Sequence, residues 1–276
     1  MKRRDLLKAS LSLSLLGAAP GWAAAARLSR ARVRPGAALW PSQAEWQSLQ
    51  RATGGRLLKL ESPFAGCGSG CAELLGQIGN PYFIGDQPAL TQTSGWIDAW
   101  TSRTSAYAVA ARSAADVAAA VNFARTHNLR LVVKGGGHSY LGTSNAPDSL
   151  LVWTRAMNAA TVHEAFVAEG CAGIAPQPAV TLGAGAMWSD AYAAVTTRGG
   201  RYVQGGGCTT VGVAGLVQSG GFGSFSKNFG TAAAGLLEAE VVTADGEVRI
   251  ANACVNPELF WAIKGGGGGS LGVVTR

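Results

Sequence analysis

Two short glycine-rich stretches constrain the fold of this chain more than any other feature. KGGGHSY occupies residues 134–140 and QGGGCTT occupies residues 204–210, so three consecutive glycines precede His138 in the first and Cys208 in the second. Glycine loses more conformational entropy on folding than any other residue, so a triplet within a domain needs a structural reason. The triplets indicate two places where the backbone passes so close to another group that side chains are excluded.

The charge of the chain is concentrated at its start. The chain is 47% hydrophobic and 14% charged, a composition typical of a globular protein with a core. Of its 23 basic and 16 acidic residues, eight and one lie in residues 1–34, which leaves 15 of each sign and no net charge in the rest. A neutral body lacks the electrostatic footprint of a polyanion-binding protein, so we expect no nucleic-acid partner.

The basic start predicts an export signal over residues 1–26. A charged beginning is followed by a modest apolar run and small residues suited to cleavage. The run is too short and too weakly apolar for a membrane anchor, and we expect none elsewhere. The pair Arg3–Arg4 before Asp5 resembles a twin-arginine signal, a type that carries folded proteins. We therefore expect a protein exported to the periplasm or the medium by the twin-arginine machinery, with an uncleaved amphipathic helix as the alternative.

Five cysteines in an exported protein suggest disulfide bonds. Cys67 and Cys71 are close enough in sequence to bridge within a loop, and Cys171 and Cys254 are possible partners. Because five is an odd number, at least one cysteine remains unpaired. Cys208, which lies within the glycine cluster, is the natural candidate.

Regular structure becomes readable only after the first hundred residues. We expect residues 27–100 to form an irregular N-terminal extension with one helix near 42–51, and residues 101–276 to form the main domain. Ser113 is predicted to cap a helix that ends near His127. Strands are predicted at 106–112, 129–134, 150–153, 160–167 and 179–185, a hairpin at 236–251, and further helices at 188–198 and 256–265. This order, with its antiparallel hairpins, favours an α+β fold over a doubly wound sheet.

Several familiar sites fail on context or spacing. Gly267, Gly269 and Gly272 match the dinucleotide-binding pattern G-x-G-x-x-G, but a helix precedes them and a strand follows, the reverse of the arrangement that this chemistry needs. The chain has no C-x-x-C or H-x-x-x-H pair, so we expect no metal site. His138 and Cys208 could imitate a Cys–His hydrolase, but the glycines around both residues argue against it.

The first triplet directly follows a predicted strand. Its successive N–H groups can donate to a phosphate without interference from side chains, although tight packing in a turn would explain the glycines equally well. The stretch VGVAGLVQSGGFGSFSKNFG at 211–230 adds more glycines than a turn needs. Together the two regions suggest a long, flat ligand against which several backbone segments are pressed.

Five motifs in one order resemble a known family. KGGGHSYLGTS, the strand and hairpin after it, QGGGCTTVGVAGLVQSGGFG, LLEAEVVTADGEV and NPELFWAIKGGGGGSLGVVT occur in this order in FAD-linked oxidases of the vanillyl-alcohol oxidase superfamily. The berberine-bridge-enzyme-like branch is the most similar. The resemblance covers roughly residues 100–276, and it implies the two-subdomain FAD-binding domain (PCMH type) of that superfamily.

The resemblance also implies which residues hold the cofactor. Gly135–Gly137 with Ser139 would bind the FAD diphosphate. The His138 imidazole would bond to the 8α-methyl carbon of the flavin and the Cys208 thiolate to flavin C6, because both are nucleophiles facing an electron-poor ring. Members with the histidine bond alone also exist, and Thr209 stands where many relatives have proline. The expected cofactor-binding residues are Gly135, Gly136, Gly137, His138, Ser139, Gly142, Gly207, Cys208, Thr210, Val211, Gly212, Gly215, Gly220, Gly221 and Val242.

The resemblance covers only the flavin-binding half of such enzymes. Relatives have a second half of similar length that forms the substrate site and supplies the usual catalytic base, so no catalytic residue is identified in this chain. We expect a substrate domain to be missing. Two functions remain open: the flavin half of an enzyme that transfers a hydride from an alcohol- or amine-type small molecule to covalent FAD, with oxygen or another acceptor, and a truncated non-catalytic flavin-binding fragment.

Overall fold

The computed structural model describes residues 31–66, 68 and 71–276. Within this part, Arg34–Arg276 form one compact unit. The predicted export signal at residues 1–26 lies outside the described residues, and so does Cys67. No helix among the described residues has the length and apolar character needed to cross a membrane.

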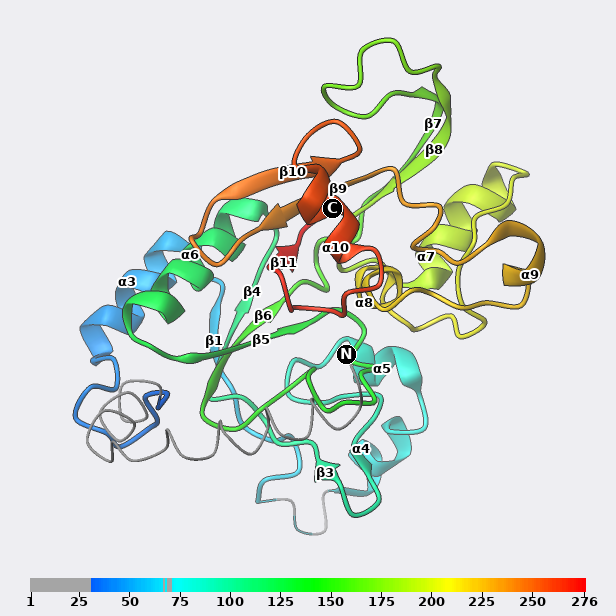
Figure 1. Ribbon diagram of the computed structural model, residues 1–276. Coiled ribbons are helices and arrows are strands. Elements are labelled where there is room, and N and C mark those ends of the chain that lie inside the picture. The colour runs from blue at the N-terminus through cyan, green and yellow to red at the C-terminus, as the bar shows by residue number, and fades with distance from the viewer. Residues whose placement is uncertain (1–30, 67, 69–70) are drawn as a thin grey trace, which may run out of the picture. The chain divides into compact units, whose positions relative to one another are not determined.

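The first sheet has four strands in the order β1-β4-β6-β5 (Figure 1). Its strands are β1 (Leu57–Lys59), β4 (Tyr107–Ala110), β5 (Arg130–Lys134) and β6 (Ser149–Trp153). β4, β6 and β5 are parallel, and β1 pairs antiparallel with β4 at one edge. The continuous apolar run of β6 has Leu150, Leu151 and Val152 fully buried, as expected for a central strand covered on both faces.

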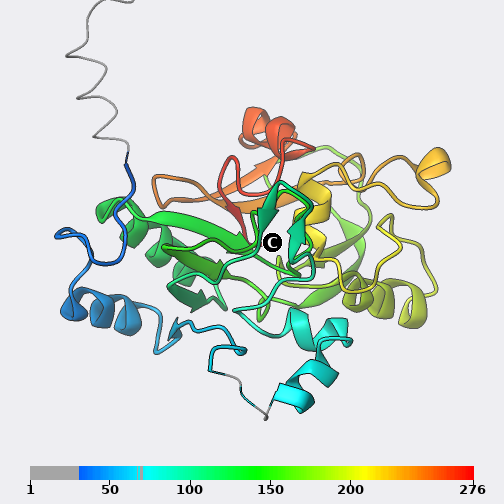
Figure 2. The same ribbon diagram turned by 90° about the horizontal axis from the view of Figure 1, so that it is seen from below.

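Two helices lie side by side beside this sheet (Figures 1 and 2). α6 (Ala114–Thr126) begins at the predicted cap, where the Ser113 hydroxyl accepts a hydrogen bond from the Asp116 N–H. α3 (Gln43–Ala52) confirms the helix predicted near 42–51 and begins with a capping box at Ser42. The ring centroids of Trp46 in α3 and Phe123 in α6 lie 4.8 Å apart, so the two helices pack against each other through these side chains.

A second, antiparallel sheet has the order β10-β9-β11. β9 (Glu238–Val242) and β10 (Val248–Asn252) form the predicted hairpin, and β11 (Val273–Val274) pairs with the other edge of β9. α10 (Pro257–Ile263) packs on this sheet through Leu259, Phe260 and Ile263. The predicted helix-before-strand order around Gly267–Gly272 is confirmed, because α10 precedes these glycines and β11 follows them.

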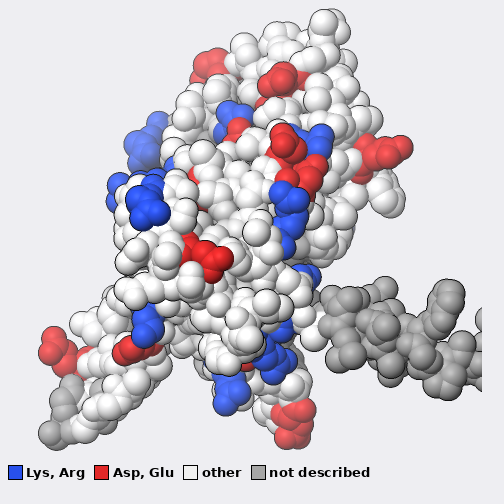
Figure 3. Space-filling model, turned by 90° about the vertical axis from the view of Figure 1, so that its left-hand side faces the viewer, with Lys and Arg blue, Asp and Glu red and all other residues white. Residues whose placement is uncertain are grey.

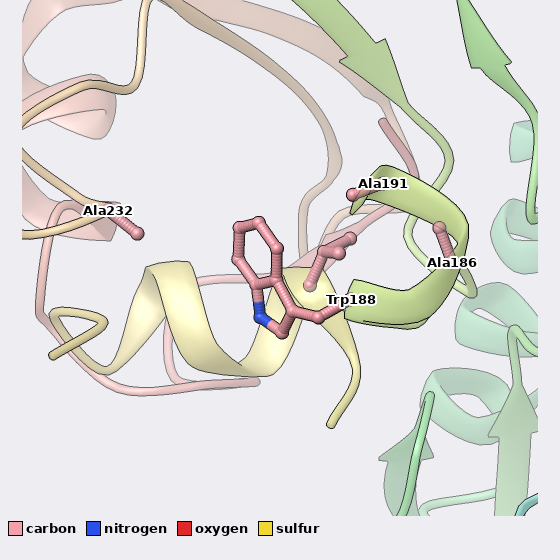
Figure 4. Close-up of a cluster of buried hydrophobic side chains, with 5 residues drawn as sticks. Ala186, Trp188, Ala191 and Ala232 are labelled. Carbon is pink, nitrogen blue, oxygen red and sulfur yellow. The ribbon is translucent and has the colours of Figure 1, made fainter. Parts of the chain in front are cut away.

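A third buried cluster forms around Trp188. The hairpin β7 (Ala160–Phe166) and β8 (Gln177–Leu182) leads into α7 (Trp188–Tyr192), which continues as a π-helical turn, η2 (Ala193–Arg198). Trp188 is buried against Ala186, Ala191, Val213 and Ala232 (Figure 4). Two short helices follow this region in sequence, α8 (Val213–Gln218) and α9 (Ser226–Phe229). α8 was not predicted, because its six residues are too few to show a helical period.

One of the two expected cysteine pairings is confirmed in full. Cys171 and Cys254 form a disulfide across 83 residues of sequence, which joins the loop after β7 to the end of β10. Cys71 is also disulfide-bonded. Cys208 is a free, exposed thiol, in agreement with the prediction that it stands apart from the pairs.

The expectation of an irregular segment at 27–100 needs correction. Its described part contains α3, α4 (Cys71–Gln77), α5 (Pro81–Gly85), the hairpin β2 (Gly95–Trp96) and β3 (Trp100–Thr101), and β1. β1 belongs to the first sheet, so that sheet begins well before the expected boundary at residue 101. Three residues carry too little pattern to predict a strand, and β1 exists because β4 supplies its hydrogen-bond partners.

The mixture of helices, one partly parallel sheet and separate antiparallel strands confirms the α+β class. On the face drawn in Figure 3, basic and acidic side chains are interspersed rather than gathered into a patch of one sign. Among the described residues, no group of three or more histidine, cysteine, aspartate or glutamate side chains could hold a metal ion.

Candidate functional site

The two glycine-rich stretches meet backbone to backbone. A Cβ atom added at Gly136 would lie 2.6 Å from the Thr210 carbonyl oxygen and 2.7 Å from the Gly212 nitrogen. A Cβ atom added at Gly212 would lie 2.8 Å from the Gly136 nitrogen. These distances are shorter than the van der Waals separation of a carbon atom from a nitrogen or oxygen atom, so a side chain at either position would strain the backbone. Tight packing, which the sequence left open as an alternative, therefore explains these two glycines.

Other glycines of the second stretch face side chains or open space. A Cβ atom at Gly205 would fall within the Trp188 ring, 2.4 Å from its nearest atom, so this glycine lets the tryptophan pack. In contrast, Cβ atoms at Gly207 and Gly215 would meet no atom within 4 Å. The glycines at these two positions leave room beside Cys208 and on α8 that the protein does not fill.

The meeting of the stretches brings three predicted site residues together. The Thr210 hydroxyl lies 3.1 Å from His138 Nε2 and 3.7 Å from Cys208 Sγ. Thr210 is buried, whereas His138 is half-buried and Cys208 is exposed. We call these three residues the His–Thr–Cys cluster. The buried threonine thus orients an imidazole and a thiol that are 70 residues apart in sequence, with both reachable from outside.

Burial keeps the imidazole of this cluster neutral near pH 7. Burial lowers the pKa of His138 from its ordinary value, and a hydrogen bond to the Thr210 backbone partly opposes that shift. Within the described part of the chain, the ring's side-chain contact joins Nε2 to the Thr210 hydroxyl, and the tautomer decides which of the two groups donates. A neutral imidazole is the nucleophilic form of histidine, because one of its two ring nitrogens carries a lone pair rather than a proton.

The loop after His138 is held together by its own hydroxyl groups. Ser139 Oγ lies 2.7 Å from Thr143 Oγ1 and accepts hydrogen bonds from the N–H groups of Leu141 and Thr143, both at 3.3 Å. Gly142 faces the Trp100 ring, 2.7 Å from where its Cβ would be. The predicted site residues Ser139 and Gly142 therefore shape a compact hydroxyl-rich turn at the end of the glycine loop.

The other predicted residues lie at different places. Val211 packs on the Trp188 cluster, and Gly221 packs against Ala232. Gly220 has no atom within 4 Å of a Cβ position. Val242 is buried in β9 between β10 and β11, so its described strand contacts place it in the second sheet rather than in the His–Thr–Cys cluster. His163, which is not among the predicted site residues, lies 2.8 Å through Nε2 from the Thr181 hydroxyl within the β7–β8 hairpin.

Sequence reasoning missed Lys134, which is the last residue of β5. Its ammonium is buried and donates to the carbonyl oxygens of Gln87, Pro88 and Leu90 at 2.9, 2.6 and 2.7 Å. In the described residues no carboxylate pairs with it, and burial lowers the pKa of Lys134 to about 7. The sequence signal was a lysine at the end of a buried strand. The carbonyl groups that accept its hydrogen bonds come from residues 87–90, a segment in which the sequence shows no pattern of helix or strand.

The same segment also holds the glycine loop from the other side. The Gly137 carbonyl accepts from the Gln92 N–H at 3.0 Å, and the Thr93 hydroxyl donates to the His138 carbonyl at 3.4 Å. Residues 87–93 therefore hold the loop that carries His138 through hydrogen bonds to its backbone, and the Lys134 ammonium binds the first part of the same segment.

Comparisons with known proteins agree with this arrangement. Residues 105–252 match the family described as FAD binding domain. The FAD-linked oxidoreductase malF of Malbranchea aurantiaca is 36% identical over 296 residues, which cover 98% of this chain and 50% of malF. The FAD-linked oxidoreductase asqF of Emericella nidulans is 34% identical, covering 92% of this chain and 49% of asqF. The chain spans about half the length of these curated relatives.

Solved structures show the same fold. The VAO-type flavoprotein MtVAO615 from Myceliophthora thermophila C1 aligns with a TM-score of 0.76 and 34% identity, over 88% of this chain and 48% of that protein. A glucooligosaccharide oxidase from Acremonium strictum aligns with a TM-score of 0.55 and 30% identity, over 62% of this chain and 34% of its own. That enzyme is described as carrying a 6-S-cysteinyl, 8α-N1-histidyl FAD.

Proposed function

We propose, from the premise that this chain belongs to the FAD binding domain family of VAO-type flavoproteins, that it is the flavin-binding part of an oxidoreductase with covalently attached FAD. In the proposed reaction an alcohol- or amine-type small molecule gives a hydride to the flavin, and oxygen or another acceptor takes up the electrons. The His–Thr–Cys cluster is the observation that carries the proposal, because it places the two expected flavin-bonding side chains around one buried hydroxyl.

The residues present fit a flavin. Gly207 and Gly215 leave unfilled space beside the exposed Cys208 thiol, and a side chain at either position would reduce it. The hydroxyl-rich turn at Ser139, with the N–H groups of the first glycine loop, would hold the diphosphate. The FAD, when bound, supplies an electron-poor ring carbon and a two-electron acceptor.

The chain's own residues prepare the attachment. The neutral His138 imidazole would provide the lone pair for a bond to the flavin methyl carbon, and Cys208 Sγ would provide the pair for a second bond to a ring carbon. Each bond replaces one N–H or S–H bond of the protein and one C–H bond of the flavin. The two protons and two electrons released per bond would go to molecular oxygen, which would leave as hydrogen peroxide. Thr210 holds both side chains in position through the contacts described above.

Four variants test the tether directly. Wild type and a histidine control, His127→Ala at the end of α6, should keep fluorescent flavin on a denaturing gel. His138→Ala and Cys208→Ala should each keep flavin through the remaining bond, and the double variant should keep none. Release of all flavin from wild type by acid precipitation would refute the tether. The flavin content of each variant before denaturation measures FAD binding separately from covalent attachment.

A truncated, non-catalytic flavin-binding fragment is the second candidate. The observation behind it is an exposed apolar group beside the glycine loop, which consists of Trp96, Ile97, Tyr140 and Leu141. Exposed apolar patches of this kind mark surfaces that pack against another domain or protein. The DNA downstream of the Arg276 codon distinguishes the two candidates: an open frame that continues into a substrate domain supports the enzyme, and an immediate stop supports the fragment.

We further propose that the protein is exported by the twin-arginine machinery and works outside the cytoplasm, on the basis of Arg3–Arg4 and the short apolar run after them. A covalent cofactor suits that location, because a dissociable one is lost when its free concentration falls far below its dissociation constant. Replacing both arginines by lysine should leave precursor in the cytoplasm, and unchanged export would refute the proposal.

A further inference from the structure

The phenol of Tyr82 reaches the residue that follows Cys208. Tyr82 lies in α5, and its hydroxyl donates to the Thr209 hydroxyl at 3.2 Å, across 127 residues of sequence. Thr209 stands between Cys208 and Thr210, two members of the His–Thr–Cys cluster. The match to the FAD binding domain family begins at residue 105, so Tyr82 lies outside it. A segment outside the matched domain therefore contacts the second glycine stretch.

Two contacts near Tyr82 hold α5 to the rest of the unit. Gly85, at the end of α5, packs against Met187 so closely that an added Cβ atom would overlap the methyl carbon of the methionine. The next residue, Asp86, pairs with the largely buried Arg155 at 2.8 Å. Met187 directly precedes α7, and Arg155 lies shortly after β6. Tyr82 therefore extends from a helix that is fixed to two other parts of the structure.

Thr209 is held from two sides. Its carbonyl accepts from the Ser189 N–H of α7 at 2.9 Å, and its hydroxyl accepts from the Tyr82 phenol of α5. Because the peptide bond between Cys208 and Thr209 is planar, fixing Thr209 restricts the positions that the Cys208 backbone can take. The two helices thus set the place from which the thiol projects.

The Cys208 thiol is only weakly held by its own contact. It is exposed, and its distance to the Thr210 hydroxyl is 3.7 Å. Thiols are weak hydrogen-bond partners, so this contact does not by itself fix the direction of Sγ. Misplacing a reacting atom by about 1 Å can lower a reaction rate by roughly 100-fold. The residues that hold the backbone beside Cys208 therefore matter to any reaction in which the thiol must meet one particular atom.

We propose that Tyr82 is a positioning residue for the second flavin bond, and that it acts through Thr209 to hold Cys208 Sγ within reach of the flavin ring. This inference rests on the proposed function. The step keeps the balance given there: the S–H bond and one ring C–H bond break, the carbon–sulfur bond forms, and molecular oxygen takes up two protons and two electrons. Tyr82 takes no part in that transfer, so its hydroxyl should affect attachment at Cys208 and not at His138.

The rates of attachment at two sites of one protein test the proposal. The full chain, prepared without flavin, is mixed with FAD in air, and mass spectrometry of its peptides follows the flavin on His138 and on Cys208. Tyr82→Phe should slow attachment at Cys208 by about fivefold, the equivalent of one hydrogen bond, and leave the His138 rate within about twofold. Thr209→Val should do the same. The double variant should be no slower than either single variant, because both remove one interaction.

Two variants and a second reaction serve as controls. Thr209→Ser keeps the hydroxyl and should attach flavin at the wild-type rate. Tyr107→Phe removes a phenol hydroxyl from β4 and should also leave both rates unchanged. Iodoacetamide is a small electrophile that can approach an exposed thiol from many directions. Its reaction with Cys208 in the flavin-free protein should therefore proceed at the same rate in all of these variants.

Three outcomes for Tyr82→Phe would overturn the proposal. Equal slowing at His138 and Cys208 would show a general structural role, and an unchanged Cys208 rate would show no role. Slower alkylation would show that the phenol changes the reactivity of the thiol rather than its position. If wild type itself gains no flavin on Cys208, this inference and the second bond of the proposed function are both wrong. Normal attachment in wild type with no effect of Tyr82→Phe refutes this inference alone.

Discussion

Replacing Gly136 by alanine tests whether the two glycine stretches are shaped by each other. The added Cβ would lie 2.6 Å from the Thr210 carbonyl oxygen and 2.7 Å from the Gly212 nitrogen. Both atoms belong to the backbone and cannot rotate away, so the two segments must separate by several tenths of an ångström. Overpacking of this kind costs about 1–3 kcal/mol. For a unit of this size, the melting temperature should fall by roughly 2–4 °C per kcal/mol.

Gly207→Ala is the matched control for this prediction. Its Cβ would meet no atom within 4 Å and its backbone φ is not positive, so the change should be neutral or should stabilise by at most about 1 kcal/mol. Thermal unfolding of both flavin-free variants, followed by circular dichroism, gives the comparison. Equal melting temperatures would refute the packing argument. If Gly207→Ala melts as expected but the variant binds less FAD than wild type, the unfilled space at Gly207 is part of the cofactor site, as proposed.

Two further predictions concern residues outside the glycine stretches. The Cys171–Cys254 disulfide links residues 83 positions apart and so restricts the unfolded chain. Replacing both cysteines by serine should lower the free energy of unfolding, measured by urea titration, by about 4 kcal/mol. A loss below about 1 kcal/mol would contradict this. Burial lowers the pKa of Lys134 to about 7, so between pH 7 and its ordinary pKa the unfolded chain binds a proton that the folded protein does not. The free energy of unfolding should therefore rise with pH in this window by up to about 1.4 kcal/mol per unit relative to Lys134→Met, and parallel pH profiles would show that folding leaves the pKa unchanged.

The candidate site could be predicted in part because its residues sit in contiguous motifs. GGGHS and GGGC name His138 and Cys208 within a few letters, and the resemblance assigned them a shared cofactor. Lys134 lies in the same stretch but was missed. Its role depends on three carbonyls from a segment about 45 residues earlier, and no local pattern records such a partner.

The sequence by itself determined the elements whose stabilising contacts are local. The helix that starts at Ser113 is capped by a residue three positions away, and the hairpin around Gly246 turns within a few residues. Periodicity and turn chemistry are visible at that range. Only the tertiary structure decided the pairing of β1 with β4, the contact of Gly136 with Gly212, and the position of the Thr210 hydroxyl between His138 and Cys208. Apart from the local contact between Thr210 and Cys208, these contacts join segments about 50 to 76 residues apart, and their geometry depends on how the sheets and loops pack together rather than on any single segment.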